Sequence, residues 1–176
     1  MTENTNPLQQ YYRQPAIYIK LPSEGRYYDK NTYTPTETGE IPILPMTAKD
    51  ELSFKTPDAL INGQATVDVI KSCVPNMLDP WKMVNYDTDA VLLAIRIATY
   101  GETMDISYVV PVVNQSQQHT INVPSILEQL AKVKIDDYAT TAKGFKIKIN
   151  PLTYNNLTRI QIARFEQQKM AGTVNE

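Results

Sequence analysis

Apolar and polar residues alternate in four short stretches of the chain, and this period-two pattern predicts β-strands. The first stretch is 17–21, and residues 22–25 follow it as a turn, because proline presets φ at the second turn position and glycine accepts positive φ at the last. The stretches 104–110 and 119–123 predict a β-hairpin, and 145–149 predicts a half-exposed strand with lysines between its apolar residues. Together they predict a small antiparallel sheet.

In the middle of the chain the apolar spacing changes to three and four residues, which is typical of amphipathic helices. Thr47 and Asp50 form a near-capping box, and Pro57 suits the first turn of the next helix. Asp87 is expected to cap the longest helix, and Ser125 the helix after the hairpin. The predicted helices cover residues 47–55, 57–62, 65–73, 87–100, 125–133 and 153–171, and the inward residues of the last are Leu157, Ile160, Ala163 and Phe165.

The order of these elements predicts an α+β fold with an extended N-terminal arm, a helical middle, a small antiparallel β-sheet or hairpin and a C-terminal helix. Residues 1–16 are polar, poor in charge and without apolar periodicity, so we interpret them as extended. We therefore divide the chain into residues 1–46, an arm with its Leu-Pro-Ser-x-Gly turn segment, and residues 47–176, a single α+β domain.

Composition narrows the function mainly by exclusion. The 176 residues are 42% hydrophobic and 20% charged with a net charge of −2, as in an ordinary globular protein without a large basic field for nucleic acid. One Cys and one His exclude a disulfide framework and a Cys/His zinc cage within one chain. No apolar run approaches the ~20 residues that span a bilayer, and the N-terminus lacks signal-peptide features, so a reducing cytosol is the default compartment.

The side chains that could support catalysis do not form a recognisable constellation. His119 opens a predicted strand with no Ser or Cys at a motif spacing, and Cys73 lies between apolar residues as a structural thiol does. Asp87 and Asp89 fit a helix start, and 136–137 fits a solvated turn. The six glycines are scattered singly, so no phosphate-binding loop exists. We predict no enzyme activity and no catalytic, metal-binding or cofactor-binding residues.

Tyrosine is the unusual part of the composition. Eleven Tyr stand against three Phe and one Trp, and six of the Tyr lie in the first 33 residues. Tyrosine combines a large apolar face with a polar tip, which suits both half-buried surfaces and protein interfaces. Two interpretations stay open: the segment docks on its own domain, or it contacts a partner protein. The candidate partner-binding residues are Tyr11, Tyr12, Ile17, Tyr18, Leu21, Pro22, Gly25, Tyr27 and Tyr28.

A short basic stripe lies in the C-terminal third of the chain. Lys146 and Lys148 alternate with apolar residues of the predicted strand, and Lys143 precedes them. Lysine on an exposed strand protects a sheet edge from pairing, and it also contacts phosphates. Together with Arg159 and Arg164, the stripe supports an alternative function, that of a small nucleic-acid-binding accessory protein.

Several stretches of the chain carry a family resemblance. Residues 20–28 read Lys-Leu-Pro-Ser-Glu-Gly-Arg-Tyr-Tyr, residues 45–51 read Pro-Met-Thr-Ala-Lys-Asp-Glu, and residues 96–101 read Arg-Ile-Ala-Thr-Tyr-Gly. They resemble the Leu-Pro-Ser-x-Gly-x-x-Tyr signature, the Pro-Met-Thr-x-x-Glu-Glu stretch and the Arg-x-x-x-Tyr-Gly helix end of the T4-type tailed-phage baseplate protein family, which contains baseplate hub assembly proteins. The resemblance runs from about residue 17 to residue 150, and 58–63 and 70–74 continue it.

The resemblance implies a structural or assembly protein of a contractile phage tail that contributes to baseplate hub assembly by protein–protein binding. The implied partners are other baseplate and tail proteins, the hub and the tape measure among them, in an oligomeric assembly. The implied location is the virion tail or, during assembly, the cytoplasm of the infected cell. Neither a cofactor nor a membrane is implied. In this mechanism residues 1–46 wrap a neighbouring protein.

One motif departs from the family pattern. Many relatives carry a Cys-Pro-x-Cys element where this chain has Val110-Pro111-Val112-Val113. Paired thiols on a hairpin suit a small metal knuckle, so their loss argues against zinc here. The hairpin is then expected to be held by apolar packing of Met104, Ile106, Tyr108 and Val110.

Overall fold

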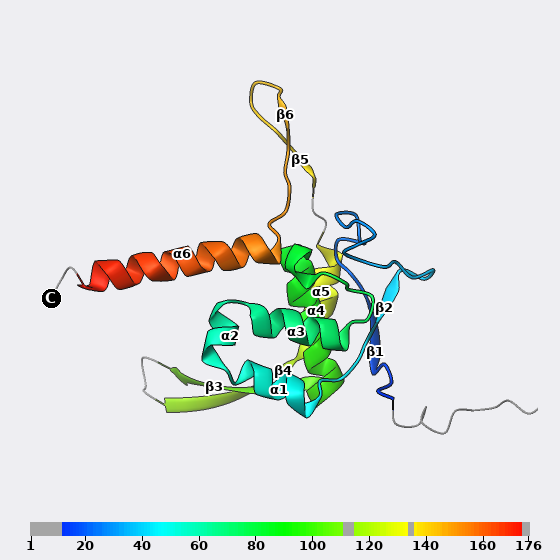
Figure 1. Ribbon diagram of the computed structural model, residues 1–176, viewed down its shortest axis with the longest axis vertical. Coiled ribbons are helices and arrows are strands. Elements are labelled where there is room, and N and C mark those ends of the chain that lie inside the picture. The colour runs from blue at the N-terminus through cyan, green and yellow to red at the C-terminus, as the bar shows by residue number, and fades with distance from the viewer. Residues whose placement is uncertain (1–11, 111–114, 134–135, 174–176) are drawn as a thin grey trace, which may run out of the picture.

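In the described part of the chain, residues 12–110, 115–133 and 136–173, the computed structural model has six α-helices and three two-stranded antiparallel sheets (Figure 1). The predicted α+β class is confirmed. The strands are β1 (Ile17–Lys20), β2 (Glu40–Ile43), β3 (Thr103–Val110), β4 (Gln115–Asn122), β5 (Tyr138–Thr140) and β6 (Lys146–Lys148). The helices are α1 (Ala48–Phe54), α2 (Pro57–Ile61), α3 (Gln64–Cys73), α4 (Asn85–Tyr100), α5 (Val123–Lys132) and α6 (Tyr154–Thr173), with a short 3-10 helix at Pro80–Lys82.

The core forms where β1 and β2 pack against α3 and α4. In the antiparallel β1–β2 pair, Ile17 lies opposite Ile43 and Ile19 lies opposite Ile41, so one face of the pair is apolar. That face joins the buried residues of α3 and α4 in one cluster, in which Ile41 and Ile43 are fully buried. The alternate residues of β1 consequently face solvent.

Residues on both sides of the predicted boundary at residue 46 share this core. The Leu44 N–H donates to the carbonyl of Cys73 at 2.8 Å, and the Met46 N–H donates to Thr99 Oγ1 at 3.0 Å. The segment between β2 and α1 is therefore hydrogen-bonded to the C-terminal ends of α3 and α4. The predicted division crosses a continuous core.

Two helix starts differ from the prediction, although α1 has the predicted capping box. α4 begins at Asn85, so Asp87 lies inside its first turn, where its side chain is fully buried and does not cap the helix. The reason is that other segments use its carboxylate, as described below. α5 is capped by Asn122, whose side chain accepts the Ser125 N–H at 3.0 Å, so Ser125 is not the cap. Asn is as good a cap as Ser, and it comes first in the chain.

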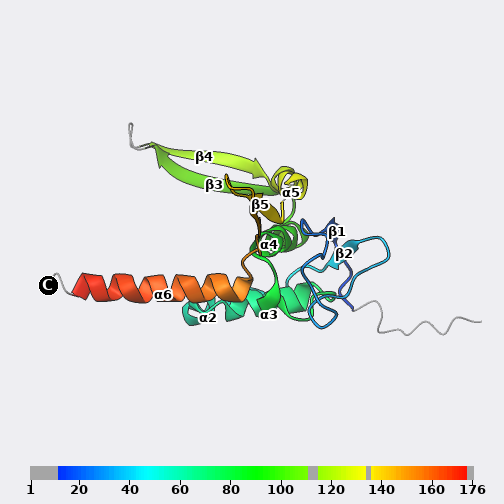
Figure 2. The same cartoon turned by 90° about the horizontal axis from the view of Figure 1, so that it is seen from above.

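Three elements extend away from the core: the β3–β4 hairpin, the β5–β6 hairpin and α6 (Figures 1 and 2). Among the described residues, neither hairpin pairs with a third strand. β5 has no counterpart in the prediction, because three residues are too few for a periodic signal. The three projections leave the compact body with much of their surface exposed.

Apolar packing covers the β3–β4 hairpin less completely than the sequence predicted. Ile106 and Tyr108 are 36% and 46% exposed. Eight cross-strand residue pairs run along the hairpin, so a backbone ladder connects the two strands over their length. The side chain of Val110 and residues 111–113 lie outside the described part of the chain.

α6 is attached to the core through its N-terminal turns. The rings of Trp81 and Tyr154 stack with centroids 5.7 Å apart, and Thr158, one turn later, is buried. Beyond this point Ile160 and Phe165 are exposed, although the sequence predicted them to face inward. The direction of the helix explains the difference, because α6 leaves the body after its first turns (Figure 2).

Gly63 allows the close approach of α6, which gives a stability prediction. Its φ is 78°, and a Cβ there would lie 3.0 Å from Thr158 Oγ1 and 3.2 Å from Tyr154 Cε1. Gly63→Ala is expected to lower the free energy of unfolding by about 2–4 kcal/mol, from left-handed strain and from overpacking. Gly39→Ala, at φ 72° with no atom within 4 Å, is the control and should show only the strain, about 1–2 kcal/mol. Chemical denaturation measures both, and equal losses would contradict the packing argument.

Candidate functional site

A buried carboxylate fixes the turn that follows β1. Asp87 extends from the first turn of α4 and is fully buried. Its Oδ1 accepts the Ser23 N–H at 2.9 Å, and its Oδ2 accepts the hydroxyls of Ser23 and, at 2.6 Å, of Tyr28. The Tyr28 hydroxyl in turn accepts the Val84 N–H at 3.1 Å. Four hydrogen bonds therefore connect the segment between Ser23 and Tyr28 to the start of α4.

Burial sets the protonation of this network. Removal from water raises the pKa of Asp87 above its usual value, and the hydrogen bonds that the carboxylate accepts act in the opposite direction. Burial, followed by the nearby Asp87 charge, raises the pKa of Tyr28, so its hydroxyl stays protonated and donates. A buried carboxylate is tolerated here because both of its oxygens have donors.

The turn is packed as well as hydrogen-bonded. Gly25 has φ 75°, and a Cβ there would lie 2.9 Å from Cε1 of Tyr33. The Tyr33 ring also contacts the ring of Tyr28, with centroids 5.8 Å apart. Leu21, at the start of the turn, is buried in the core. The turn therefore has a fixed conformation.

Some of the predicted partner-binding residues contact their own domain. Leu21, Gly25 and Tyr28 take part in the packed turn just described, and Ile17 is partly buried against the core. Tyr27 is half-buried, and its hydroxyl donates to Asp137 at the base of the β5–β6 hairpin. For these residues the structure shows the intramolecular contacts that the docking interpretation describes.

Other predicted residues are open to solvent. Tyr12 and Tyr18 are 59% and 60% exposed, and Pro22 is half-buried at the surface. Tyr11 lies outside the described residues. Tyr18 and Pro22 are brought together, because both border the same surface groove.

This groove lies between β1 and α5 and has a volume of about 290 Å³. The residues of this β1–α5 face are Tyr18, Pro22, Pro124, Leu127 and Ala131, with Lys20 and Glu128 at its edge. Its centre is apolar, and Leu127 also packs against the core. Sequence reasoning predicted a helix here and missed its contribution to the face. The apolar residues of the helix were visible in the sequence, but the sequence did not indicate that they lie beside β1.

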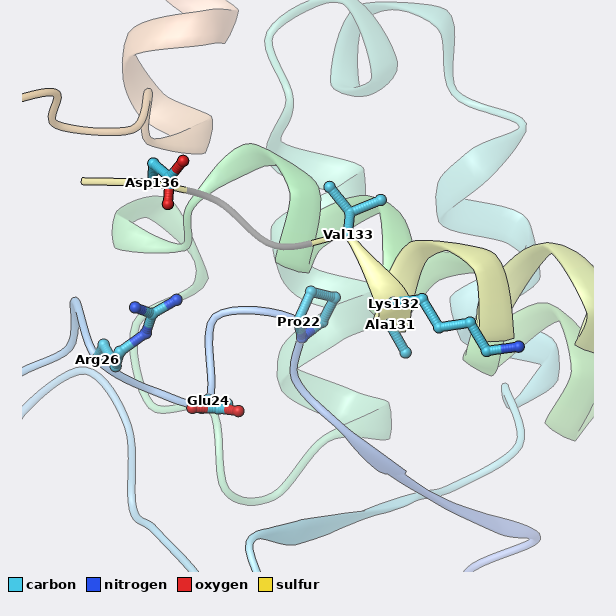
Figure 3. Close-up of a pocket in the computed structure, with 7 residues that line it drawn as sticks. All are labelled: Pro22, Glu24, Arg26, Ala131, Lys132, Val133 and Asp136. Carbon is cyan, nitrogen blue, oxygen red and sulfur yellow. The ribbon is translucent and has the colours of Figure 1, made fainter. Parts of the chain in front are cut away.

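A second hollow adjoins the groove at Pro22, and charged residues are among those that line it (Figure 3). Glu24 and Arg26 come from the turn after β1, and Lys132 and Asp136 come from the end of α5 and the segment beyond it. Residues of both charge signs therefore line the hollow together with the apolar Pro22, Ala131 and Val133. This arrangement is typical of the polar rim of a protein interface, whereas a polyanion requires an excess of positive charge.

Arg13 fixes the segment that precedes β1, a role that the sequence did not reveal. Its guanidinium donates to the carbonyl of Pro45 at 2.8 Å and to the carbonyl of Ser72 at 2.7 Å, and Nη1 lies 3.6 Å from Asp50 Oδ2. Burial acts to raise the pKa of Asp50, but hydrogen bonds from Thr47 and Ser72 and the Arg13 charge hold it below its usual value. The chain is thus fixed at both ends of β1.

The residues considered for catalysis are not assembled into a reactive group. His119 is exposed on β4, opposite Ile106 in the hairpin ladder. Cys73 is buried in the core, and burial raises the pKa of its thiol to about 11, which keeps it protonated at neutral pH. Across residues 12–110, 115–133 and 136–173, no three His, Cys, Asp or Glu side chains are grouped so that they could hold a metal ion. No helix in the same ranges is long and apolar enough to cross a membrane.

The sequence profile of the T4 bacteriophage base plate protein family matches residues 15–173, which include the core, the β1–α5 face and all three projections. The chain belongs to this family. The predicted resemblance is confirmed, and this protein is a structural protein of the phage baseplate. Comparisons with curated proteins and with solved structures gave no match.

The contribution of the Asp87 network to stability of this base plate protein is testable by removing one hydroxyl. Tyr28→Phe keeps the ring but deprives Asp87 of a donor and the Val84 N–H of an acceptor. We expect the free energy of unfolding to fall by about 2–3 kcal/mol, measured by urea denaturation. Tyr18→Phe changes an exposed tyrosine of β1 and should cost less than about 0.5 kcal/mol. Equal effects of the two variants would contradict the network.

The raised pKa of Asp87 predicts a pH dependence of defined sign. Between the unfolded value, near 3.8, and the higher folded value, the native protein binds more protons than the unfolded chain. The contribution of Asp87 to stability is therefore greatest below this window, falls as pH rises through it, and is constant above it. The difference in unfolding free energy between the wild type and Asp87→Asn should follow this course in urea melts across acidic pH. A difference that increases with pH in the same window would contradict the assignment.

Proposed function

We propose that this protein contributes to assembly of the baseplate hub of a contractile phage tail by binding other tail proteins, without catalytic chemistry of its own. Family membership establishes the baseplate, and the β1–α5 face is the observation that supports binding as the mechanism. The face is an apolar groove with a mixed-charge border, and this composition is typical of protein interfaces.

The groove is also preformed. The turn that carries Pro22 is fixed by the bonds to Asp87, and β1 is fixed by its pairing with β2. A partner that binds here does not have to order the turn, so less conformational entropy opposes association. The proposed partners are other baseplate proteins, namely the hub and the tape measure, in an oligomeric assembly. In this proposal the segment 1–46 extends the contact, with Tyr12 and Tyr18 as its exposed aromatic side chains.

The residues of the alternative, nucleic-acid-binding function lie apart from this face. Lys143, Lys146 and Lys148 are exposed in the β5–β6 hairpin, and Arg159 and Arg164 are exposed on α6. The mixed charges of the face do not favour a polyanion, so hub assembly by protein binding is the function that the geometry supports best.

Site-specific cross-linking tests the proposal in infected cells. A photoreactive phenylalanine analogue at position 18 is expected to cross-link to a hub or tape-measure protein, identified by mass spectrometry. The same analogue at Leu52, which is exposed on α1, is the matched control and should not form that product. Cross-links from position 18 only to proteins outside the tail would contradict the proposal.

A charged face should prevent assembly without unfolding the protein. Tyr18→Glu with Ala131→Glu places two carboxylates on exposed positions of the groove. We expect the yield of infectious particles to fall roughly tenfold or more, because buried unpaired charge at an interface is strongly unfavourable. The melting temperature should stay close to that of the wild type. Normal particle yield with this double variant would contradict a role of the β1–α5 face.

A further inference from the structure

Positive charge is concentrated in one part of this acidic protein. Residues 138–165 contain five Lys or Arg and no Asp or Glu, although the whole chain has a net charge of −2. Three of the five, Lys143, Lys146 and Lys148, lie in the β5–β6 hairpin. The β1–α5 face does not include this hairpin, so its chemistry is independent of the proposed function.

The hairpin is firmly rooted but otherwise uncovered. At its base the Tyr27 hydroxyl donates to Asp137, and the Asn85 N–H donates to the Leu152 carbonyl at 2.9 Å. Beyond the base the hairpin extends away from the body (Figure 1), and all residues of β5 and β6 are exposed. An isolated two-stranded hairpin is marginally stable in water. A third strand would therefore stabilise it.

The side chains of β6 alternate between two chemistries. Phe145, Ile147 and Ile149 lie on one face of the hairpin and are between 47% and 67% exposed. Lys146 and Lys148 lie on the other face, because successive strand residues point to opposite sides. Each face of β6 thus has one character, apolar or cationic.

The outer edge of β6 also has unpaired backbone groups. The Ile149 N–H donates to the Asp137 carbonyl at 2.7 Å, and the Thr141 N–H donates to the Phe145 carbonyl at 2.9 Å. In an antiparallel pair these inward-bonded residues alternate with residues whose N–H and C=O point outward. Lys146 and Lys148 therefore direct their backbone groups to the outer edge, and within the described residues β6 pairs with β5 alone.

We propose that the outer edge of β6 is a docking site for an extended protein segment in which acidic and apolar residues alternate, and that this segment adds to the hairpin as a third strand. Backbone hydrogen bonds would form with Lys146 and Lys148. Acidic side chains of the added strand lie beside the two lysines, and its apolar side chains lie beside Phe145, Ile147 and Ile149 on the opposite face.

Charge and shape exclude two other occupants. A second copy of β6 would bring lysines beside lysines, which is destabilising, and lysine at an edge is a common protection against such self-pairing. Single-stranded nucleic acid would neutralise the lysines but leave Ile147 and Ile149 exposed, since bases stack on aromatic rings rather than on aliphatic side chains. In an added strand with alternating acidic and apolar residues, the acidic side chains pair with the lysines and the apolar side chains cover the opposite face of β6.

Binding of a defined peptide by the full chain tests the proposal. The probe is a fluorescent octapeptide of alternating glutamate and valine, followed by anisotropy. Lys146→Glu with Lys148→Glu should weaken binding about tenfold or more, whereas Lys30→Glu with Lys49→Glu, which changes net charge equally at exposed positions, should have little effect. A peptide of alternating lysine and valine should not bind. Absence of binding by the glutamate peptide, or tighter binding of single-stranded DNA, would overturn the proposal.

A proline variant separates strand addition from simple charge attraction. Lys148→Pro removes an outward N–H and leaves the bonds between β5 and β6 intact, and proline is tolerated on edge strands. Lys148→Ala removes the same charge but keeps the N–H. The proline variant should bind the glutamate peptide at least several-fold more weakly than the alanine variant, at an unchanged melting temperature. Equal binding would overturn strand addition. Tyr18→Glu should leave peptide binding unchanged, so failure here is distinguishable from failure of the β1–α5 face.

Discussion

The carboxyl group of Asp87, buried at the start of α4, is the constraint on which the rest of the structure depends. A buried carboxylate is stable only when donors meet its oxygens. Ser23 and Tyr28, which lie 64 and 59 residues earlier in the chain, are those donors. Their bonds draw the N-terminal segment onto α4, β1 is thereby positioned, and β2 pairs with it. A segment with the local composition of an arm thus becomes one layer of the core.

The molecule consequently has two regions that differ in how far their apolar side chains are buried. In the body, β1, β2, α3 and α4 bury their apolar faces against one another, and the buried Asp87 has its hydrogen-bond partners. In the projections, the two hairpins and α6 expose apolar side chains at the surface. A baseplate is built from many proteins, and a fixed body with uncovered extensions is a suitable form for one of its components.

Local sequence patterns predicted many elements of this fold, but they did not predict the contacts between residues that are distant in the sequence. The period of two gave β1 and the β3–β4 hairpin, and the capping pattern at Thr47 gave the start of α1. Asp87 was misassigned because an acid at a helix start looks the same whether it caps that helix or binds a distant turn. Arg13 was missed for a similar reason, since its partners are far away in sequence. The apolar spacing of α6 predicted a helix, but this spacing does not show whether another part of the protein packs against the apolar side of the helix.

For the candidate site, Tyr18 and Pro22 could be named from the sequence, whereas the contribution of α5 required the tertiary fold.

The length of α6 determines how far this helix extends from the body of the protein. A helix of 20 residues is about 30 Å long, close to the diameter of a small domain. Its root is clamped by the Trp81–Tyr154 stack, while the β5–β6 hairpin diverges from the same place in another direction (Figure 1). The helix and the hairpin leave the body from one root in different directions, so their outer ends lie far apart. The protein is therefore shaped as a bracket with two separate outer ends.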